Sequence, residues 1–340
     1  MTFKIAVVGA TGNVGREMLK IISERSFPAR EVVALASKNS AGTKIPFGDH
    51  TIEVRDLDSY DFSGTDICLM SAGHALSKRM SPIIAESGCT VIDNSSAWRY
   101  DSDVPLIVPE VNPESIHLSS RKNIIANPNC STIQLVVVLK PLHDYANIKR
   151  VIVSTYQSVS GAGKKGIDEL IYNTESVLTQ KPVKSKVFTK NIAFNIIPCI
   201  DVFMDDAFTK EEWKVLAETQ KILDPKIKIS CTAARVPVLI GHAESVNIEF
   251  KKSIAPDEAR AILDKALGCR VIDNPKNGEY MTPAESLDQD SVFISRIRKD
   301  ATIKHGLSLW IVANNLRKGA ALNAVQIAEL LAKKTSEKSE

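Results

Sequence analysis

Cys130 is the residue whose type and position best suit covalent chemistry. It lies in the run NPNCST at 127–132, where proline and asparagine end a strand and a helix is predicted from Ser131 to Tyr145. The N-terminus of a helix stabilises a thiolate, the nucleophilic form of cysteine, which can add to an aldehyde carbonyl. The resulting thiohemiacetal can pass a hydride to a nicotinamide and leave a thioester. From the residues alone, a buried structural cysteine is the alternative.

His242 is the histidine that best suits the base that such a thiol needs. It follows the run RVPVLIG, which begins at Arg235 and lies on a predicted strand, Lys228–Leu239. An arginine and a histidine at the two ends of a short proline-containing segment could converge on an anionic substrate. An ordinary surface or capping histidine is the alternative.

Glycines at positions 9, 12 and 15 follow a predicted strand, Phe3–Gly9, and open a predicted helix, Asn13–Glu24. G-x-x-G-x-x-G is a variant of the dinucleotide fingerprint, in which the glycines allow a tight turn, approach of the backbone to a pyrophosphate, and close packing of helix on strand. The helix N-terminus then offers N–H groups to the phosphates. A purely structural glycine-rich turn is the alternative.

The next predicted strand, Val32–Ser37, indicates which dinucleotide is bound. An NAD site usually has an acidic residue at the end of this strand to bind the ribose 2′-hydroxyl. Here Lys38 and Ser40 follow and no acid is present. A lysine and hydroxyls could hold a 2′-phosphate, which favours NADP; a solvated loop lysine is the alternative.

The elements that position these residues predict an α/β chain with two different parts. Before Asn127, short strands alternate with helices, as in the parallel βαβ units of a Rossmann-type dinucleotide-binding domain. Its remaining strands are predicted at Ile67–Ala72, Thr90–Asp93, Leu106–Val108 and Ile124–Ala126, with a helix at Ala75–Glu86.

After Asn127, long strands with few helices predict an α+β domain with a mixed or antiparallel sheet. Its other strands are predicted at Arg150–Tyr156, Ser245–Lys251, Val292–Arg298 and Leu307–Val312, and its helices at Lys165–Leu178, Lys210–Leu223 and Pro256–Leu267. A last helix is predicted at Leu322–Lys333, followed by a polar tail, TSEKSE.

Composition agrees with two globular domains and excludes several classes of protein. The chain has 340 residues, of which 44% are hydrophobic and 24% charged, and its net charge of +3 gives no support to nucleic-acid or membrane binding. No run approaches the roughly 18 apolar residues of a membrane span, and no signal peptide is predicted. The six cysteines form no CxxC pair and no metal-ligand spacing. We therefore expect no metal, a reducing compartment and a cytoplasmic location.

Several stretches together resemble the bacterial aspartate-semialdehyde dehydrogenases over essentially the whole length. They are GATGNVG at 9–15, SSAWRYDSDVPLIVPEVN at 95–112, ANPNCSTIQ at 126–134, TYQSVSGAGKKG at 155–166, ETQKIL at 218–223, RVPVLIGHAESV at 235–246 and NNLRKGAALNAVQIAE at 314–329. The resemblance implies an NADP-binding domain at 1–128, completed by a C-terminal helix at 316–340 that packs back on it. It also implies a catalytic and dimerisation domain at 129–315, and a homodimer.

The resemblance also implies a role for each matching residue. Cys130 would be the nucleophile, His242 the general acid/base, and Gln157 would orient the substrate. Arg235 would bind the substrate carboxylate and Glu218 its amino group, while Arg99, Lys221 and Asn129 would bind phosphate. The residues implied to hold NADP are Gly9, Thr11, Gly12, Asn13, Val14, Lys38, Ser40, Ser160, Gly161 and Asn315. Lys38 stands where an arginine is common in the family, so the preference for NADP over NAD could be weaker.

The implied reaction is reduction of L-aspartyl-4-phosphate by NADPH to L-aspartate 4-semialdehyde and phosphate, in the synthesis of lysine, threonine, methionine and diaminopimelate. A related acyl-phosphate reductase, such as N-acetyl-glutamyl-phosphate reductase, is the enzymatic alternative. Glu218 argues against it, because an acetylated amine carries no charge. A non-catalytic nucleotide-binding module is a second alternative, which the presence of both Cys130 and His242 disfavours.

Overall fold

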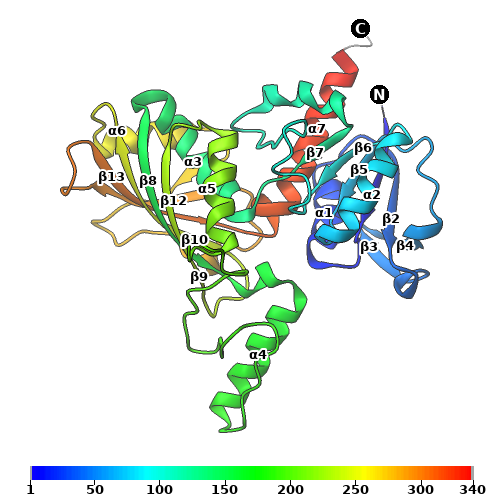
Figure 1. Cartoon of the computed structure of the whole chain (residues 1–340), viewed down its shortest axis with the longest axis horizontal. Helices are drawn as coiled ribbons and strands as arrows, with labels where there is room; N and C mark the ends of the chain where they lie inside the picture. Colours follow the sequence, from blue (N-terminus) through cyan, green and yellow to red (C-terminus); the bar gives the residue numbers. More distant parts are fainter. Residues whose placement is uncertain (1, 338–340) are drawn as a thin grey trace. The chain divides into compact units, whose positions relative to one another are not determined.

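The computed structural model describes residues 2–337, with side chains described as far as residue 335. The chain forms two compact units. The first contains the residues up to Asn129 and those from Ala320 onward, and the second runs from Cys130 to Gly319. Figure 1 shows the elements of each unit.

The first unit is built on a seven-stranded sheet. Its strands are β1 (Phe3–Val8), β2 (Ala29–Ala36), β3 (Lys44–Phe47), β4 (His50–Asp56), β5 (Ile67–Met70), β6 (Thr90–Asp93) and β7 (Ile124–Ala126). They lie in the order β3-β4-β2-β1-β5-β6-β7, and every neighbouring pair is parallel except β3 and β4. The six parallel strands have the doubly wound order, in which β1 stands where the strand order reverses. Ligands bind at the carboxyl ends of the strands at this point.

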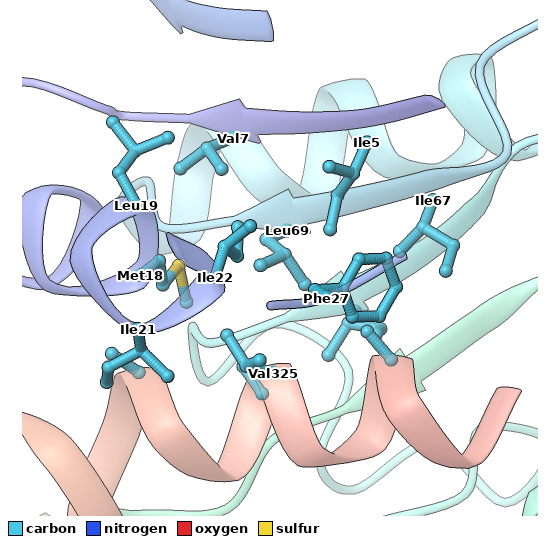
Figure 2. Packing of buried hydrophobic residues seen from close by; sticks show 14 of the residues in the cluster. Ile5, Val7, Met18, Leu19, Ile21, Ile22, Phe27, Ile67, Leu69 and Val325 are labelled. Carbon is cyan, nitrogen blue, oxygen red and sulfur yellow. The ribbon is translucent and has the colours of Figure 1, made fainter. Parts of the chain in front are cut away.

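Helices α1 (Asn13–Glu24) and α7 (Leu322–Glu337) share the core of the first unit with the sheet; α2 (His74–Glu86) lies between β5 and β6 in the chain. Met18 and Ile22 of α1 are buried, as is Val325 of α7, and Figure 2 shows them packed with Leu69 of β5. Burying an aliphatic side chain of this size contributes roughly 1.5–3 kcal/mol. The end of the chain therefore belongs structurally to the unit that the beginning of the chain forms.

The second unit is built on a six-stranded mixed sheet in the order β11-β12-β13-β10-β8-β9. Its strands are β8 (Ile148–Gln157), β9 (Lys228–Arg235), β10 (His242–Phe250), β11 (Cys269–Val271), β12 (Val292–Lys299) and β13 (Gly306–Ala313). Strand β10 pairs antiparallel with both β8 and β13, and β9 runs parallel to β8. As a result, the end of β9 lies beside the end of β8, and the start of β10 lies close by.

Three helices pack on this sheet: α3 (Cys130–Ala146), α5 (Lys210–Ile222) and α6 (Pro256–Lys265). The fourth helix of the unit, α4 (Lys164–Leu178), extends away from the sheet in Figure 1 and has a small core of its own, which includes Val159 and Leu170. Large apolar side chains remain exposed on α4 and on the segment after it. They include Ile171, Tyr172, Leu178, Phe194, Ile196, Val202 and Phe203.

The fold class predicted from the sequence is confirmed, but several element boundaries are not. The run Leu106–Val108 forms only an isolated bridge, from Leu106 to Ala126. Strand β9 ends at Arg235 rather than Leu239, and residues 236–241 form a loop, where Pro237 has no N–H for a sheet. Helix α7 continues through 335–337, where a polar tail was predicted, and residues 338–340 lie outside the described part of the chain.

Strands β3, β4 and β11 were not predicted. They are short, and most residues of the first two are exposed or partly buried, so these strands lack a long apolar run.

Candidate active site

The glycine turn after β1 has the geometry that a bound pyrophosphate needs. Gly9 has φ +78°, and a Cβ there would lie 2.2 Å from the carbonyl oxygen of Ser71. A Cβ at Gly15 would lie 2.2 Å from the carbonyl oxygen of Gly9, so the start of α1 packs directly on the turn. Helix α1 has Gly12 as its N-cap, with no side-chain cap and no acid in its first turn. Its first N–H groups are therefore available to an anion.

The region after β2 presents a cation on the same unit. Lys38 and Ser40 form a short 3₁₀ turn directly after the strand, and Lys38 is exposed. Among the described residues, no acidic side chain pairs with the Lys38 ammonium. The four residues from Thr11 to Val14 are partly or fully exposed. These residues fit the phosphates of a dinucleotide, including one that bears a 2′-phosphate.

The residues that lead to Cys130 are held by buried hydrogen bonds within the first unit. The guanidinium of Arg99, 7% exposed, donates to the carbonyl oxygens of Asn127 (2.9 Å) and Asn94 (3.0 Å). The Asn127 amide donates to the side-chain oxygen of Asn94 and to the carbonyl oxygen of Ala320 (3.1 Å). Asn129 is buried. Sequence reasoning missed Asn94 and Asn127, whose signal was only their place at the carboxyl ends of two strands.

Cys130 is the first residue of α3, one residue earlier than the predicted start of the helix. Every residue from Ser131 to Leu139 of the helix is buried, which fixes the position of its N-terminus. The cysteine itself is partly exposed. Gly319 lies in close contact with Cys130, since a Cβ added at Gly319 would lie 3.0 Å from the Cys130 Cβ. The helix N-terminus therefore presents this side chain in a fixed position, where the helix dipole favours a thiolate.

His242 is the first residue of β10 and is completely buried. The backbone N–H of Ser158 donates to its Nδ1 at 3.0 Å. Burial, together with the smaller effect of the positive charge of Arg235, lowers the pKa of His242 to about 3. The imidazole is therefore neutral at physiological pH.

Arg235, the last residue of β9, is near both Cys130 and His242. Its Nη1 donates to the carbonyl oxygen of Ser158 at 2.8 Å. Burial lowers its pKa, and the negative charges of Glu211 and the Cys130 thiolate act in the opposite direction. A Cβ at Gly161 would lie 2.8 Å from Arg235 Nη1 and 3.5 Å from His242 Cε1 and Nε2. Arg235 is therefore a neighbour of both Cys130 and His242, and Gly161 lines the space beside the imidazole.

Two further groups of hydrogen bonds surround this space. The Gln157 amide accepts from the Thr155 hydroxyl (3.0 Å) and donates to the Glu211 carboxylate (3.2 Å). The Asn315 side-chain oxygen accepts from the N–H of Gly241 (2.8 Å), and its nitrogen donates to the Ser160 hydroxyl (2.9 Å).

Sequence reasoning missed Glu211 and singled out Glu218 instead. The two glutamates lie seven residues apart, on the same face of α5, so that spacing was the available signal. Glu218 is completely buried further along α5, and Lys221 is exposed in the last turn of this helix.

Comparisons with known proteins show the family to which the chain belongs. Residues 4–119 match the family model described as semialdehyde dehydrogenase, NAD binding domain, and residues 139–318 match semialdehyde dehydrogenase, dimerisation domain. The chain is 54% identical over 336 residues to an aspartate-semialdehyde dehydrogenase of Aquifex aeolicus, covering 98% of this chain and 99% of that protein. The chain belongs to the aspartate-semialdehyde dehydrogenase family.

Solved structures of this family extend the comparison. Aspartate-semialdehyde dehydrogenase II of Vibrio cholerae, complexed with ASA, has a TM-score of 0.96 and 47% identity, covering 98% of this chain and 99% of that one. The Candida albicans enzyme, solved with NADP, has a TM-score of 0.76 and 25% identity, covering 98% and 99%. The predicted family and enzyme class, an oxidoreductase with a nicotinamide-dinucleotide-binding domain, are confirmed. Within residues 2–337, no helix is long and apolar enough to cross a membrane.

Proposed function

We propose that the chain catalyses the NADP-dependent reductive dephosphorylation of L-aspartyl-4-phosphate to L-aspartate 4-semialdehyde through a thioester on Cys130. This reaction serves lysine, threonine, methionine and diaminopimelate biosynthesis. The observation that carries the proposal is the position of Cys130 at the N-terminus of α3, with Arg235 as a common neighbour of this cysteine and His242. A thiolate, an arginine and a buried imidazole are the groups that acyl transfer from an anionic acyl phosphate requires.

The other predicted site residues of the chain are proposed to bind or orient the groups of the substrate. Arg235 has guanidinium nitrogens besides the one that bonds Ser158, and a planar fork suits the α-carboxylate. The carboxylate of Glu218 suits the ammonium. Arg99 and Lys221 supply positive charge for the phosphate, with Asn129 as a polar neighbour. The Gln157 amide, held by Thr155 and Glu211, orients the acyl group.

The proposed steps use Cys130 as the group that carries the acyl chain. The thiolate attacks the carbonyl carbon, the C–O bond to phosphate breaks, and phosphate leaves with the bonding electron pair. NADPH, when bound, supplies the hydride that reduces the thioester. The thiohemiacetal then collapses, the C–S bond breaks, and the aldehyde leaves with the thiolate restored. His242 acts as the general acid/base as the aldehyde is released.

The first unit binds NADP in this proposal. The turn and helix start at Gly9, Thr11, Gly12, Asn13 and Val14 take the pyrophosphate, while Lys38 and Ser40 take the 2′-phosphate. Ser160, Gly161 and Asn315 belong to the second unit, where they line the space beside His242 or contact its neighbours. They are proposed to receive the nicotinamide end.

The test is phosphate-dependent reduction of NADP by L-aspartate 4-semialdehyde, followed by the absorbance of NADPH. We expect activity in the native chain and in Cys199→Ala, which removes another partly exposed cysteine of the same unit, and none in Cys130→Ala. Activity with N-acetyl-glutamate semialdehyde alone would favour the related reductase. NADP binding without turnover of either aldehyde would favour the nucleotide-binding module, and activity that survives Cys130→Ala would exclude the thioester.

We further propose that the chain forms a homodimer through its second unit, which matches a dimerisation domain. The exposed apolar side chains of α4, such as Ile171 and Leu178, are the kind of surface that a second copy covers. The double substitution Ile171→Glu with Leu178→Glu should shift the mass measured by light scattering towards the monomer. An unchanged mass would place the interface elsewhere. The cytoplasmic location stays a prediction.

A further inference from the structure

A buried glutamate follows His242 at the start of β10. Glu244 is completely buried, and it lies two positions after His242. Side chains two positions apart on a strand point to the same face of the sheet. Helix α3 contacts β10, and the side chain of Gln134 on this helix acts on the Glu244 carboxyl as a hydrogen-bonding group. The face that carries His242 and Glu244 is therefore the face that α3 covers.

Gln134 has the same relation to Cys130 that Glu244 has to His242. It lies four residues after the cysteine, and residues four apart are neighbours on one side of a helix. Gln134 is completely buried, and it is the only polar residue between Ile133 and Leu139. Burying an amide is costly unless it is hydrogen-bonded, so an amide at this position requires a partner.

The carboxyl group of Glu244 has the complementary donor and acceptor. Burial raises its pKa well above the usual value, while hydrogen bonding by Gln134 acts in the opposite direction. The group is therefore a neutral carboxylic acid at physiological pH, and an acid and a primary amide can form two hydrogen bonds at once. No described residue forms a hydrogen bond of normal geometry with either side chain. Pairing requires only that the two groups approach each other, since Gln134 is already near enough to act on the carboxyl.

We propose that Gln134 and Glu244 are positioning residues, a neutral amide–acid pair that joins α3 to β10 through two hydrogen bonds and so sets the placement of Cys130 relative to His242. This inference deepens the proposed function, on which its kinetic test rests. Hydrogen bonds are directional, so the pair defines one register of the helix on the strand, whereas the apolar contacts along the rest of α3 do not. Neither residue touches the substrate in this proposal.

The neutral state of Glu244 suits its surroundings. Burial raises the pKa of the Cys231 thiol on β9, and the negative charges of Glu244, Glu212 and Glu211 act in the same direction. These acids therefore lie in one part of the interior. A carboxylate at position 244 would add a further negative charge to the region of the glutamates and of the Cys130 thiolate, which is unfavourable. A carboxylic acid holds the helix without adding that charge.

The kinetic test compares three variants with the native chain in the aldehyde oxidation assay. Glu244→Gln should keep kcat within about twofold, because two primary amides can form the same pair of hydrogen bonds. Gln134→Leu should lower kcat by about tenfold or more with little change in either KM, because the reacting groups are misplaced while substrate contacts remain. The double variant Gln134→Leu with Glu244→Leu should have nearly native stability, since both polar groups are removed together, but the same loss of kcat. A native kcat in the double variant, or a loss in Glu244→Gln equal to that in Gln134→Leu, would overturn the proposal.

Two controls separate positioning from damage to the fold or to the thiol. Leu263→Ala removes a buried side chain from α6 of the same unit and should lower the melting temperature while the kcat of the folded protein stays native. The rate at which iodoacetamide alkylates Cys130, followed by mass spectrometry of its peptide, should be native in the double variant, since this reaction uses the thiolate alone. Alkylation that slows in proportion to kcat would overturn the proposal, because the change would then lie in the cysteine and not in its placement relative to His242.

Infrared spectroscopy tests the hydrogen bonds without substrate. The difference spectrum between the native chain and Glu244→Gln should contain the carbonyl band of a protonated carboxyl group at neutral pH. In Gln134→Leu this band should move to higher frequency, because the carbonyl has lost its hydrogen bond. The absence of the band, or a band that Gln134→Leu leaves in place, would overturn the proposal. This measurement can fail while the proposed overall reaction is confirmed, and the reverse, so the two failures are distinguishable.

Discussion

Gly161→Ala tests whether the space beside His242 Nε2 is used in the reaction. The added methyl group would lie 2.8 Å from Arg235 Nη1, against an ordinary contact of about 3.4 Å or more, so one of the two must move by several tenths of an ångström. Arg235 is 6% exposed and bonds the Ser158 carbonyl, so it has little room to move. A displacement approaching 1 Å of a substrate-positioning group costs on the order of 10²-fold in rate, about 2.7 kcal/mol of transition-state stabilisation.

The assay is kcat/KM for phosphate-dependent oxidation of L-aspartate 4-semialdehyde, with thermal unfolding measured alongside. Gly161 does not have a left-handed φ, so we expect the activity to fall while the melting temperature changes little. The matched control is Gly163→Ala in the same loop, where φ is +77° and an added Cβ meets nothing within 4 Å. With ψ −169°, this position is in a region that is essentially restricted to glycine, so the variant should lose about 1–3 kcal/mol of stability but keep its activity when folded. Full activity in Gly161→Ala would refute the reasoning.

Three further substitutions follow from the structure. Burial raises the pKa of Glu244 well above 4.5, so the folded state keeps a proton that the unfolded chain releases, and stability is lost as pH rises above that value by up to about 1.4 kcal/mol per pH unit. Glu244→Gln should therefore gain more stability over the native chain at about pH 8 than at about pH 5 in urea unfolding, and an equal gain at both would contradict this. Gly9→Ala combines a φ of +78° with a Cβ 2.2 Å from the Ser71 carbonyl oxygen, so it should lower the melting temperature and weaken NADP binding in calorimetry; unchanged binding would remove this turn from the cofactor site. Gly319→Ala puts a methyl group 3.0 Å from the Cys130 Cβ and should slow both alkylation of Cys130 and turnover. An unchanged alkylation rate would show that the Cys130 side chain can move aside without losing its reactivity.

Patterns that repeat locally allowed much of the fold to be predicted. Helix α1, with apolar residues at helical spacing and a glycine turn before it, has the bounds that its sequence indicates, Asn13–Glu24. Strands β6 and β7 also agree, because each is a short buried run between clear breaks. The edge strand β3 and its neighbour β4 lack such a run, so their pairing depends on the rest of the sheet. Residues 236–239 of the loop at 236–241 were predicted as strand because valine and leucine occur in strands, and Pro237, which has no N–H, overrides this tendency.

Site residues could be predicted from the sequence where a few adjacent residues form an uncommon motif. They could not be predicted where their role depends on a partner that is distant in sequence. A cysteine at a helix N-terminus or a glycine triad after a strand can be recognised from a few adjacent residues. Glu211 could not be assigned in this way, since nothing near it in sequence indicates that its carboxylate meets the Gln157 amide 54 positions earlier. Many surface helices carry glutamates at such spacing, and only the fold places this one in the interior.

The position of the proton on the His242 ring is also not predictable from the sequence. The sequence identifies an imidazole but not the nitrogen that holds its proton, because the deciding donor is the backbone N–H of Ser158, which every residue type except proline has. No side-chain pattern at position 158 encodes that donor. What the sequence does encode is the surroundings that bring it into place: Asn315, whose amide oxygen must accept from Gly241, and a glycine with φ +95° before the histidine. Substituting Ser158 by alanine would leave this backbone donor in place and remove the hydroxyl, which lies 3.1 Å from the same Nδ1 and donates to Asn315.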